Sequence, residues 1–172
     1  LNIAETGAVI SVGKIDAGVR SNVIPEELTM NGTIRTLDTK VQDMIHKRVK
    51  EVVSSIAESA GAKAEIVITK QTLVTYNDPN LTQKMLPTLQ AVAGKNKVLL
   101  TPAVMGAEDF SFYQDKIPGL YFFIGGAPKG KAIAETAPHH TPDFYIDESG
   151  FLLGVKTMAN LTVDYMEMQS KK

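Results

Sequence analysis

The stretch LTMNGTIRTL at residues 28–37 alternates apolar and polar side chains, and it decides the fold of the first half of the chain. In an extended strand, successive side chains point to opposite faces. One face then carries Leu28, Met30 and Ile34, and the other carries Thr29, Asn31, Thr33 and Arg35. This pattern is typical of a strand with one buried face and one exposed face.

The sequence on both sides of this strand predicts a small β-β-α-β unit. AVISVGKI (8–15) is rich in β-branched residues and predicts a strand, which the turn-like DAGVRSNVIPEE separates from the next. Thr39 and Gln42 have the spacing of a capping box, and apolar residues recur at helical spacing up to Gly61. AEIVITK (64–70) predicts a further strand. The order suits a helix on one face of an antiparallel sheet, as in a ferredoxin-like unit that lacks one strand and one helix.

The second half has the pattern of an α/β layer structure. Asp78 and Pro79 predict the start of a helix that runs to about Gly94. KVLL (97–100) and LYFFIGG (120–126) are short apolar runs, as expected of strands buried on both faces. A last helix is expected to begin at Asp147. Its apolar side is expected to carry Phe151, Leu152, Val155, Met158, Ala159, Thr162, Tyr165 and Met166.

Composition excludes several kinds of partner and site. Lys and Arg total 18 against 19 Asp and Glu, so no basic surplus indicates a nucleic-acid partner. No apolar run approaches the roughly 20 residues that span a bilayer, so no membrane insertion is expected. The chain has no Cys, so a transition-metal site would have to use His, Asp and Glu.

The beginning of the chain, LNIAETGAVIS, lacks an initiator Met and the features of a signal peptide. We therefore interpret the chain as a fragment or a processed piece of a longer protein. With the N-terminus missing, the cytoplasm is the favoured compartment, and the absence of Cys is equally compatible with export.

Three places could carry chemistry on residue type alone. His139 and His140, within APHHTPDFYIDE, could bind a metal, perform acid–base work or merely lie in a loop. Glu108 follows a buried run, which is where ligands often bind in α/β sheets, although a solvated turn has the same appearance. Gly125 and Gly126 would let a ligand approach the backbone closely, or would form an ordinary tight turn.

Four stretches taken together are more specific: GKIDAGVRSNVIPEELTMNGTIRTLD, GAEDFSFY, IPGLYFFIGG and HHTPDFYIDE, in this order and spacing. The chain resembles the C-terminal part of the aminoacylase/carboxypeptidase metallopeptidases, peptidase family M20. It is most similar to the amidohydrolase branch that includes hippurate hydrolase and the auxin-conjugate hydrolases. One departure is that Ala17-Gly18 stands where the family usually has a Gly pair.

The resemblance implies a two-domain enzyme and a mixed α/β fold. Residues 1–76 would form most of a ferredoxin-like lid and dimerisation domain, incomplete at its N-terminus. Residues 77–172 would form the C-terminal part of an α/β catalytic domain that holds two metal ions. The lid is expected to form a homodimer.

The resemblance also implies roles for the polar loop residues. The family carries its last metal-binding His in a His-Ser/Thr-Pro-x-Phe pattern, which here makes His140 the ligand, two residues before Pro142. His139 and Glu108 would contact and orient this ligand without binding the metal themselves.

Four further residues are expected to contact the substrate. Arg35 would grip a substrate carboxylate with two parallel hydrogen bonds, and Asn22 would donate to a developing oxyanion, both across the dimer. Gly125 and Gly126 would lie along the bound substrate.

The implied reaction is hydrolysis of the amide bond of N-acyl amino acids or related small peptides, assisted by two divalent ions such as Zn, Mn, Co or Ni. In the family, the catalytic glutamate and most metal ligands lie upstream of the lid. We therefore expect no catalytic residue in this chain and no activity from it alone. The alternative is a non-enzymatic ferredoxin-like module that binds a small ligand or only dimerises.

Overall fold

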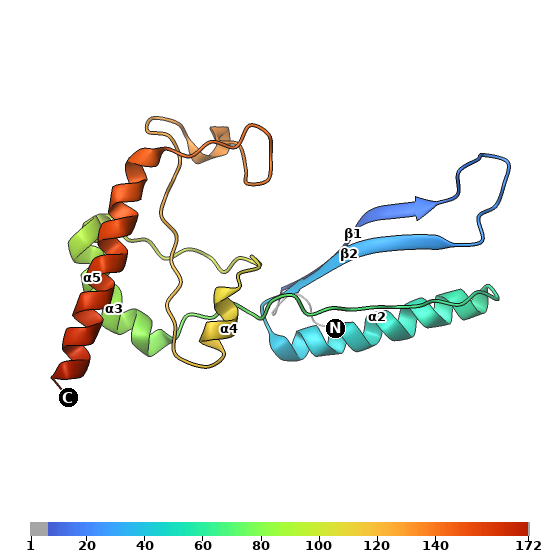
Figure 1. Ribbon diagram of the computed structural model, residues 1–172, viewed down its shortest axis with the longest axis horizontal. Coiled ribbons are helices and arrows are strands. Elements are labelled where there is room, and N and C mark those ends of the chain that lie inside the picture. Colours follow the sequence, from blue (N-terminus) through green and yellow to red (C-terminus); the bar gives the residue numbers. More distant parts are fainter. Residues whose placement is uncertain (1–6, 172) are drawn as a thin grey trace. The chain divides into compact units, whose positions relative to one another are not determined.

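The structure is a computed structural model that describes residues 7–171. The chain divides into two compact units (Figure 1). The first contains the chain up to Thr75 and the segment Pro102–Ile117, and the second contains Tyr76–Thr101 and the chain from Pro118 onward. Helices and a two-stranded sheet make the fold mixed α/β, as expected. The functional boundary expected after residue 76 stays a prediction.

The first unit begins with an antiparallel hairpin of β1 (Ala8–Ala17) and β2 (Leu28–Thr36), which confirms both expected strands. The register pairs Ile10 with Ile34, and it shifts between Val12 and Lys14 at a bulge. A Cβ atom at Gly32 would collide with the carbonyl oxygen of Ser11, so glycine is required at this point of the register.

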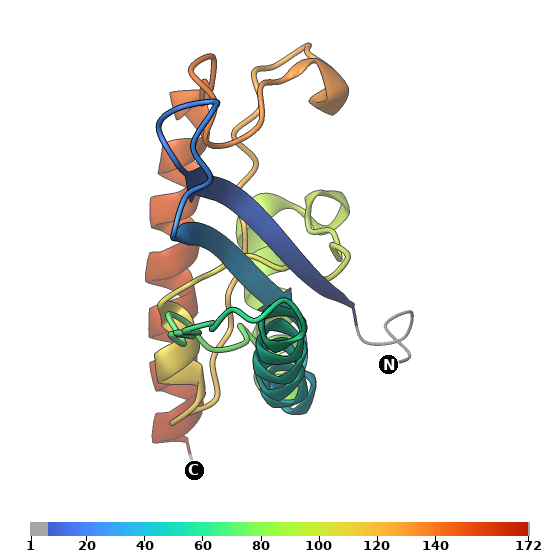
Figure 2. The same cartoon turned by 90° about the vertical axis from the view of Figure 1, so that its right-hand side faces the viewer.

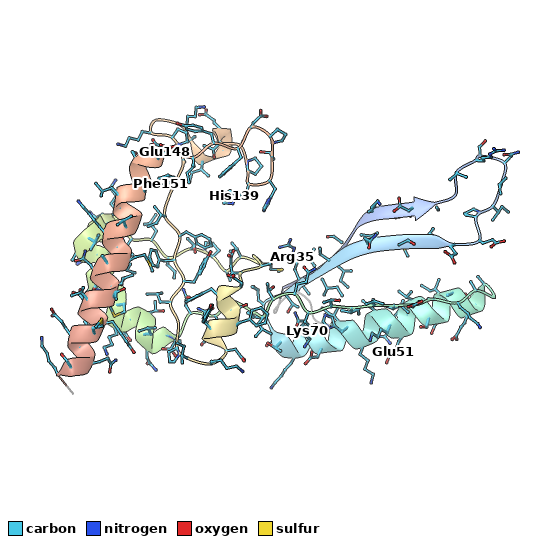
Figure 3. All side chains as sticks on the ribbon, viewed as in Figure 1. Arg35, Glu51, Lys70, His139, Glu148 and Phe151 are labelled. Carbon is cyan, nitrogen blue, oxygen red and sulfur yellow. The ribbon has the colours of Figure 1, made fainter. Side chains whose placement is uncertain are left out.

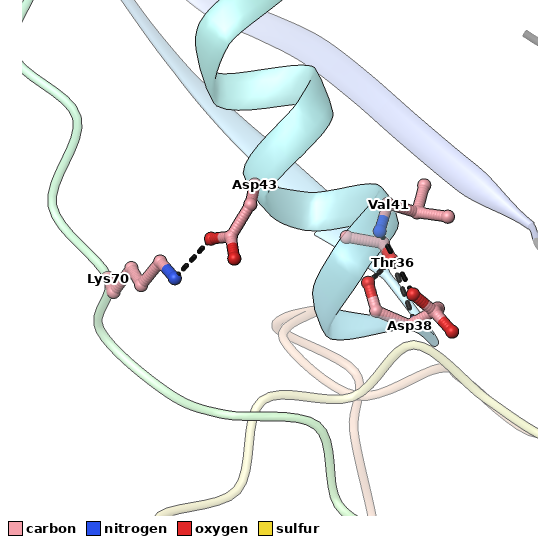
Figure 4. A network of polar contacts seen from close by, with 5 residues as sticks. All are labelled: Thr36, Asp38, Val41, Asp43 and Lys70. Atoms are coloured by element: carbon pink, nitrogen blue, oxygen red, sulfur yellow. Dashed lines mark hydrogen bonds and ion pairs between the residues drawn. The ribbon is translucent and has the colours of Figure 1, made fainter.

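Helix α2 (Thr39–Ser59) follows the hairpin and packs against β2 (Figure 2). Its cap is Asp38, whose carboxylate accepts a hydrogen bond of 2.9 Å from the Val41 N–H (Figure 4). The expectation that Thr39 caps the helix is wrong, because the cap needs an extended backbone, and Asp38 has φ −139° and ψ 128°. The end is as expected, since Gly61 follows the last turn with φ 71°.

The segment 64–70 is extended but forms no ladder, so the strand expected there is absent from the described residues. Its β-branched side chains alternate between half-buried and exposed positions, and Lys70 Nζ lies 2.6 Å from Asp43 Oδ1 on α2 (Figure 4). The expected strand at 97–100 is absent as well, because Lys97 ends the short helix η1 (Lys95–Lys97) and residues 98–100 have no strand partner in the described part of the chain. The run 120–126 likewise has no strand partner among residues 7–171. The physical reason is that a strand is defined by a neighbour that pairs with its backbone, which local sequence does not specify.

The segment Pro102–Ile117 joins the first unit through a short helix, α4 (Phe110–Gln114). Ser111 is only 1% exposed. Its hydroxyl donates to the Glu108 carbonyl oxygen at 2.6 Å and accepts from the Leu73 N–H at 3.2 Å. This one buried hydroxyl therefore ties α4 to the extended segment that follows α2.

The second unit is built on α3 (Pro79–Ala93) and α5 (Phe151–Ser170), which pack against each other (Figure 1). Asp78 caps α3 by accepting from the Leu81 N–H at 2.7 Å, and Gly94 ends it with φ 92°, as expected. The contact is partly polar, because the Thr88 hydroxyl donates to Asp164 Oδ2 at 2.5 Å. No helix in the described part of the chain is both long enough and apolar enough to cross a membrane.

Helix α5 turns a different side to α3 than the sequence predicts. Its buried or half-buried side includes Leu153, Thr157, Leu161 and Asp164. The apolar side named from the sequence is exposed, with Phe151 at 53% and Val155 at 68%. Helix α5 is apolar on both sides, and periodicity alone does not select the side that packs.

Candidate functional site

The two histidines lie in a loop, residues 127–146, that is closed at its base. The Asp147 N–H donates to the Gly126 carbonyl oxygen at 2.8 Å. The Ile146 side chain lies against Gly126 so closely that a Cβ there would be 2.5 Å from Ile146 Cγ1. The loop therefore leaves and rejoins the unit at one point, just before α5.

A tight turn at the tip of this loop sets the backbone of His140. The Thr141 hydroxyl donates to the Pro138 carbonyl oxygen at 2.7 Å, and the Phe144 N–H donates to the Thr141 carbonyl oxygen at 3.1 Å. His140 has φ 66°, and no other non-glycine residue among residues 7–171 has a positive φ. Such backbone strain is often retained where a side chain has a function.

The two imidazoles have different surroundings. The ring of His139 meets the ring of Phe144 edge-on, with centroids 4.7 Å apart and planes at 69°. The ring of His140 is 6.4 Å from that of His139, and both side chains are exposed (Figure 3 labels His139 on its loop). His139 is thus packed on an aromatic neighbour, while the imidazole of His140 is accessible to a ligand.

A metal ion would find an incomplete set of ligands here. The described residues contain no group of three or more His, Asp or Glu side chains arranged to hold a metal. A catalytic zinc takes about three protein ligands, and imidazole nitrogen is suitable for Zn, Co and Ni. His140 fits as one ligand of a larger set, and the remaining ligands would have to come from outside this part of the chain.

Arg35 and Glu108 belong to the first unit, whereas the histidine loop belongs to the second. Arg35, labelled in Figure 3, donates from Nη1 to the Met105 carbonyl oxygen at 2.8 Å. The Glu108 carbonyl accepts from Ser111, and its Oε1 lies over Gly106, 3.3 Å from where a Cβ would stand. Arg35 and Glu108 are thus both fixed around the segment 102–111, and the expected role of Glu108 toward His140 stays a prediction.

Asn22 lies in the exposed turn between β1 and β2. A shallow hollow of about 400 Å³ opens at this turn and is lined by Ala17, Gly18, Val19, Arg20, Ser21, Val23 and Pro25. Asn22 is not part of the lining. Its expected oxyanion role stays a prediction.

The glycine pair has a packing role at one of its two positions. Gly126 is required by the contact with Ile146, whereas a Cβ at Gly125 would meet nothing within 4 Å. The backbone at Gly125 is therefore the more open of the two to an approaching molecule. The substrate role expected for Gly125 and Gly126 stays a prediction.

Sequence reasoning missed what Asp147 does for the loop. Its Oδ1 accepts from the Ser149 N–H at 2.9 Å, which caps the turn η3 (Glu148–Gly150) that leads into α5. Hydrogen bonds from the hydroxyl and the N–H of Ser149, and then the N–H and the charge of Lys129, hold the pKa of the Asp147 carboxyl below its usual value. The cap was readable from the sequence. The backbone bond from the Asp147 N–H to the Gly126 carbonyl oxygen was not.

Comparisons with known proteins agree with this fold. The family model "Peptidase family M20/M25/M40" matches residues 3–164. The chain is 34% identical over 158 residues to thermostable carboxypeptidase 2 of Saccharolobus solfataricus, covering 91% of this chain and 39% of that protein. It is 30% identical over 162 residues to the IAA-amino acid hydrolase ILR1-like 4 of Arabidopsis thaliana, covering 92% of this chain and 36% of that protein.

A solved structure gives the same result. The chain superposes with a TM-score of 0.69 and 29% identity on the Bacillus subtilis YxeP protein, a dinuclear metal-binding peptidase from family M20, covering 93% of this chain and 42% of that one. The fold is therefore that of a portion of a metal-binding peptidase of this hydrolase class. The chain belongs to peptidase family M20/M25/M40. It spans about two fifths of the length of the relatives it matches.

Proposed function

We propose that this chain forms part of a metal-dependent amidohydrolase that cleaves the amide bond of N-acyl amino acids or small peptides. Membership of the family supports a hydrolase and disfavours the alternative of a non-enzymatic module. The relatives support amide substrates, since they include a carboxypeptidase and a hydrolase of IAA-amino acids. The observation that carries the proposal is the strained, exposed His140 at the tip of a loop whose base is closed.

In this proposal, His140 is one ligand of a divalent metal site. When bound, the metals polarise the amide carbonyl and make a water molecule more acidic. His139, packed on Phe144, keeps the turn in shape beside the ligand, and Glu108 orients the ligand from outside. Two ions per full-length subunit are proposed, with Zn, Mn, Co and Ni as the suitable elements.

The substrate is proposed to contact Arg35 and Asn22 across the dimer, and the backbone at Gly125 and Gly126. A guanidinium has five N–H donors, so Arg35 can bind a carboxylate while Nη1 donates to Met105. Asn22, in its exposed turn, would donate to the oxyanion, and the open backbone at Gly125 and the adjacent Gly126 would lie beside the acyl group. Hydrolysis adds water across the C–N bond and releases an amine and a carboxylic acid.

We further propose a homodimer formed through the hairpin unit. The apolar face of the hairpin is poorly covered, with Ile10 57%, Ile15 60% and Met30 52% exposed. Exposed apolar faces and strand edges of this kind recruit partners. Sedimentation at rising concentration should show a monomer–dimer equilibrium that Ile15→Lys shifts toward monomer, and a monomer at every concentration would contradict the proposal.

The metal role is tested in the full-length enzyme that contains this chain. His140→Ala should lose bound metal and amidase activity together, because one ligand is missing. His139→Ala is the matched control and should keep most of its metal, since His139 packs on Phe144 instead. Elemental analysis that finds equal metal in wild type and His140→Ala would reject the ligand role.

The chain of 172 residues by itself is proposed to be inactive, because its described residues offer no complete metal site. The check is an assay of the purified chain against N-acyl amino acids with added Zn, Mn, Co or Ni. Hydrolysis that depends on the metal would overturn this part of the proposal.

A further inference from the structure

We propose that Asn77 is a positioning residue for the candidate site. Its side-chain amide fixes the apolar run 119–126 at the start of α3, and this run ends at the base of the histidine loop. The consequence for catalysis rests on the proposed metal role of His140. The hold of Asn77 on the run does not rest on that role, so the two can be tested separately.

The amide of Asn77 binds both backbone polar groups of one distant residue. Its Nδ2 donates to the Tyr121 carbonyl oxygen at 2.7 Å, and its Oδ1 accepts from the Tyr121 N–H at 2.6 Å. Paired residues of two antiparallel strands exchange bonds in the same way. Asn77 and Tyr121 are 44 residues apart and lie in the same unit. One side chain therefore does for the run what a neighbouring strand does in a sheet.

The residue after Asn77 strengthens the same junction. The Asp78 N–H donates to the Gly119 carbonyl oxygen at 3.0 Å, and the Asp78 carboxylate caps α3 by accepting from the Leu81 N–H at 2.7 Å. Asn77 thus stands one residue before the cap of a helix. This gives the run a defined point of attachment to the rest of the second unit.

The sequence of the run does not select this position by itself. The residues from Leu120 to Ile124 are all apolar or aromatic, and none of them pairs in a strand ladder in the described part of the chain. Register is normally specified by the alternation of apolar and polar side chains, which this run lacks. Polar contacts at defined atoms, such as the two that Asn77 makes, can then decide which residue of the run lies beside the start of α3.

The other end of the run carries the site. The Gly126 carbonyl oxygen accepts from the Asp147 N–H at 2.8 Å, which closes the histidine loop. Gly125 lies close to the start of α5, since a Cβ at Gly150 would be 3.2 Å from the Gly125 carbonyl oxygen. Only four residues separate Tyr121 from Gly126. A shift of the run at Tyr121 would therefore displace Gly125 and the base of the loop.

The experiment measures backbone hydrogen exchange, segment by segment, in the full-length enzyme that contains this chain. Asn77→Ala removes both bonds, whereas the milder Asn77→Asp keeps an acceptor and loses the donor. Asn160→Asp is the matched control, because it makes the same chemical change at an exposed amide of the same unit that donates to the Lys156 carbonyl oxygen within α5. Thr88→Val, at the contact between α3 and α5, shows what a general loss of stability does.

The expected result is local. In Asn77→Ala, exchange over 119–126 should become roughly 5- to 100-fold faster, the effect of losing two net hydrogen bonds. Asn77→Asp should give an increase of about 2- to 10-fold, for one bond. The histidine loop should also exchange faster in both variants, while α3 and α5 keep their wild-type exchange. Asn160→Asp should match the wild type over 119–126, and Thr88→Val should speed up exchange over the run and the two helices alike.

Two results would overturn the proposal. One is wild-type exchange over 119–126 in either Asn77 variant, which would show that the amide does not hold the run. The other is an equal rise over the run and both helices, as expected of Thr88→Val, because Asn77 would then only stabilise the unit as a whole.

Metal affinity separates this proposal from the proposed function. Asn77→Ala should weaken metal binding by up to roughly tenfold, the low end of the range for groups that orient a metal ligand. Faster exchange over the run, together with equal metal in wild type and His140→Ala, would support the hold of Asn77 and reject the metal role of His140. Wild-type exchange over the run, together with loss of metal in His140→Ala, would give the reverse.

Discussion

Arg35 Nη1 donates a hydrogen bond of 2.8 Å to the carbonyl oxygen of Met105, which lies 70 residues further along the chain. Arg35 lies on β2, and Met105 lies in the segment that leads to Glu108 and α4. The guanidinium therefore makes a contact with a distant segment in addition to lying on the polar face of a strand. It joins the hairpin to a segment that the sequence assigns to the other functional half of the protein.

The KM for N-acyl amino acids should depend on the shape of the Arg35 side chain as well as on its charge. Arg35→Ala and Arg35→Lys should both raise KM for N-acyl amino acids in the full-length enzyme, by roughly tenfold or more, since a hydrogen bond to a charged group contributes about 1.5–3 kcal/mol. Lysine should not restore the wild-type KM, because it lacks the planar pair of N–H donors that a guanidinium presents to a carboxylate. Arg48→Ala, which loses only a surface pair with Glu51, is the control. Unchanged kinetic constants in both Arg35 variants would remove the substrate role.

The glycine pair should respond unequally to alanine. Gly126→Ala places a methyl group 2.5 Å from Ile146 Cγ1 and should lower the free energy of unfolding by about 1–3 kcal/mol through overpacking. Gly125→Ala meets no atom within 4 Å and should cost much less. Adding Ile146→Ala should recover stability in Gly126→Ala, as denaturant titration of the double-mutant cycle can show. Equal losses at both glycines would contradict the packing account.

The contact between α3 and α5 should depend on one threonine and not on another. Thr88→Val leaves Asp164 without the hydroxyl that donates to it, which should cost about 1–3 kcal/mol of unfolding free energy. Thr82 is on the same helix, and its buried hydroxyl oxygen has no hydrogen-bond partner. Thr82→Val should therefore be neutral or stabilising. Thermal unfolding of the two isosteric variants makes the comparison, and a Thr82→Val variant that is the less stable of the two would contradict it.

His46 should make the first unit less stable in mild acid. Burial, and then the positive charge of Lys70, lower the pKa of His46 below its ordinary value of 6.5, while Asp43 opposes this. The unfolded chain thus binds a proton more readily than the folded one. The contribution of neutral His46 to the free energy of unfolding is fully present above pH 6.5 and is lost as the pH falls through the pKa of His46 in the folded state.

Two variants check this pH dependence. His46→Gln should flatten the stability profile between neutral and mildly acidic pH, because no proton is then taken up at this position. Lys70→Met should reduce the acid loss, since the neighbouring cation that disfavours protonation is gone. A profile for His46→Gln that is as steep as the wild type would show that another group is responsible.

Local signals in the sequence predicted the elements that depend on near neighbours. The alternation of 28–37, the cap at Asp78 and the stop at Gly94 each act within a few residues, and each predicted its element correctly. The cap of α2 was wrong by one residue, because Asp38 and Thr39 are both able to cap and the backbone angles decide between them.

Features of the fold that depend on contacts between distant residues were not predictable from the sequence. AEIVITK has the composition of a strand, but a strand requires a partner that composition does not name. The side of α5 that packs is set by α3, since α5 offers apolar residues on both sides. In the candidate site, the family pattern marked His140, but the backbone bond from Asp147 to Gly126 that closes its loop joins residues far apart in the sequence.

The first unit is discontinuous in sequence, and this sets the order in which it can be completed during synthesis. The ribosome releases the hairpin, α2 and the extended segment up to Thr75 first. Two hydrogen bonds of this unit can form only later, because the Leu73 N–H bonds to the hydroxyl of Ser111 and the Arg35 guanidinium bonds to Met105. All of α3 is made in between. A nascent chain therefore cannot finish its first unit before residues 76–101 of the second have been synthesised, although domains made early usually fold early. Ribosome-bound chains stopped beyond residue 76 but before residue 102 should remain open to protease along the segment 62–75.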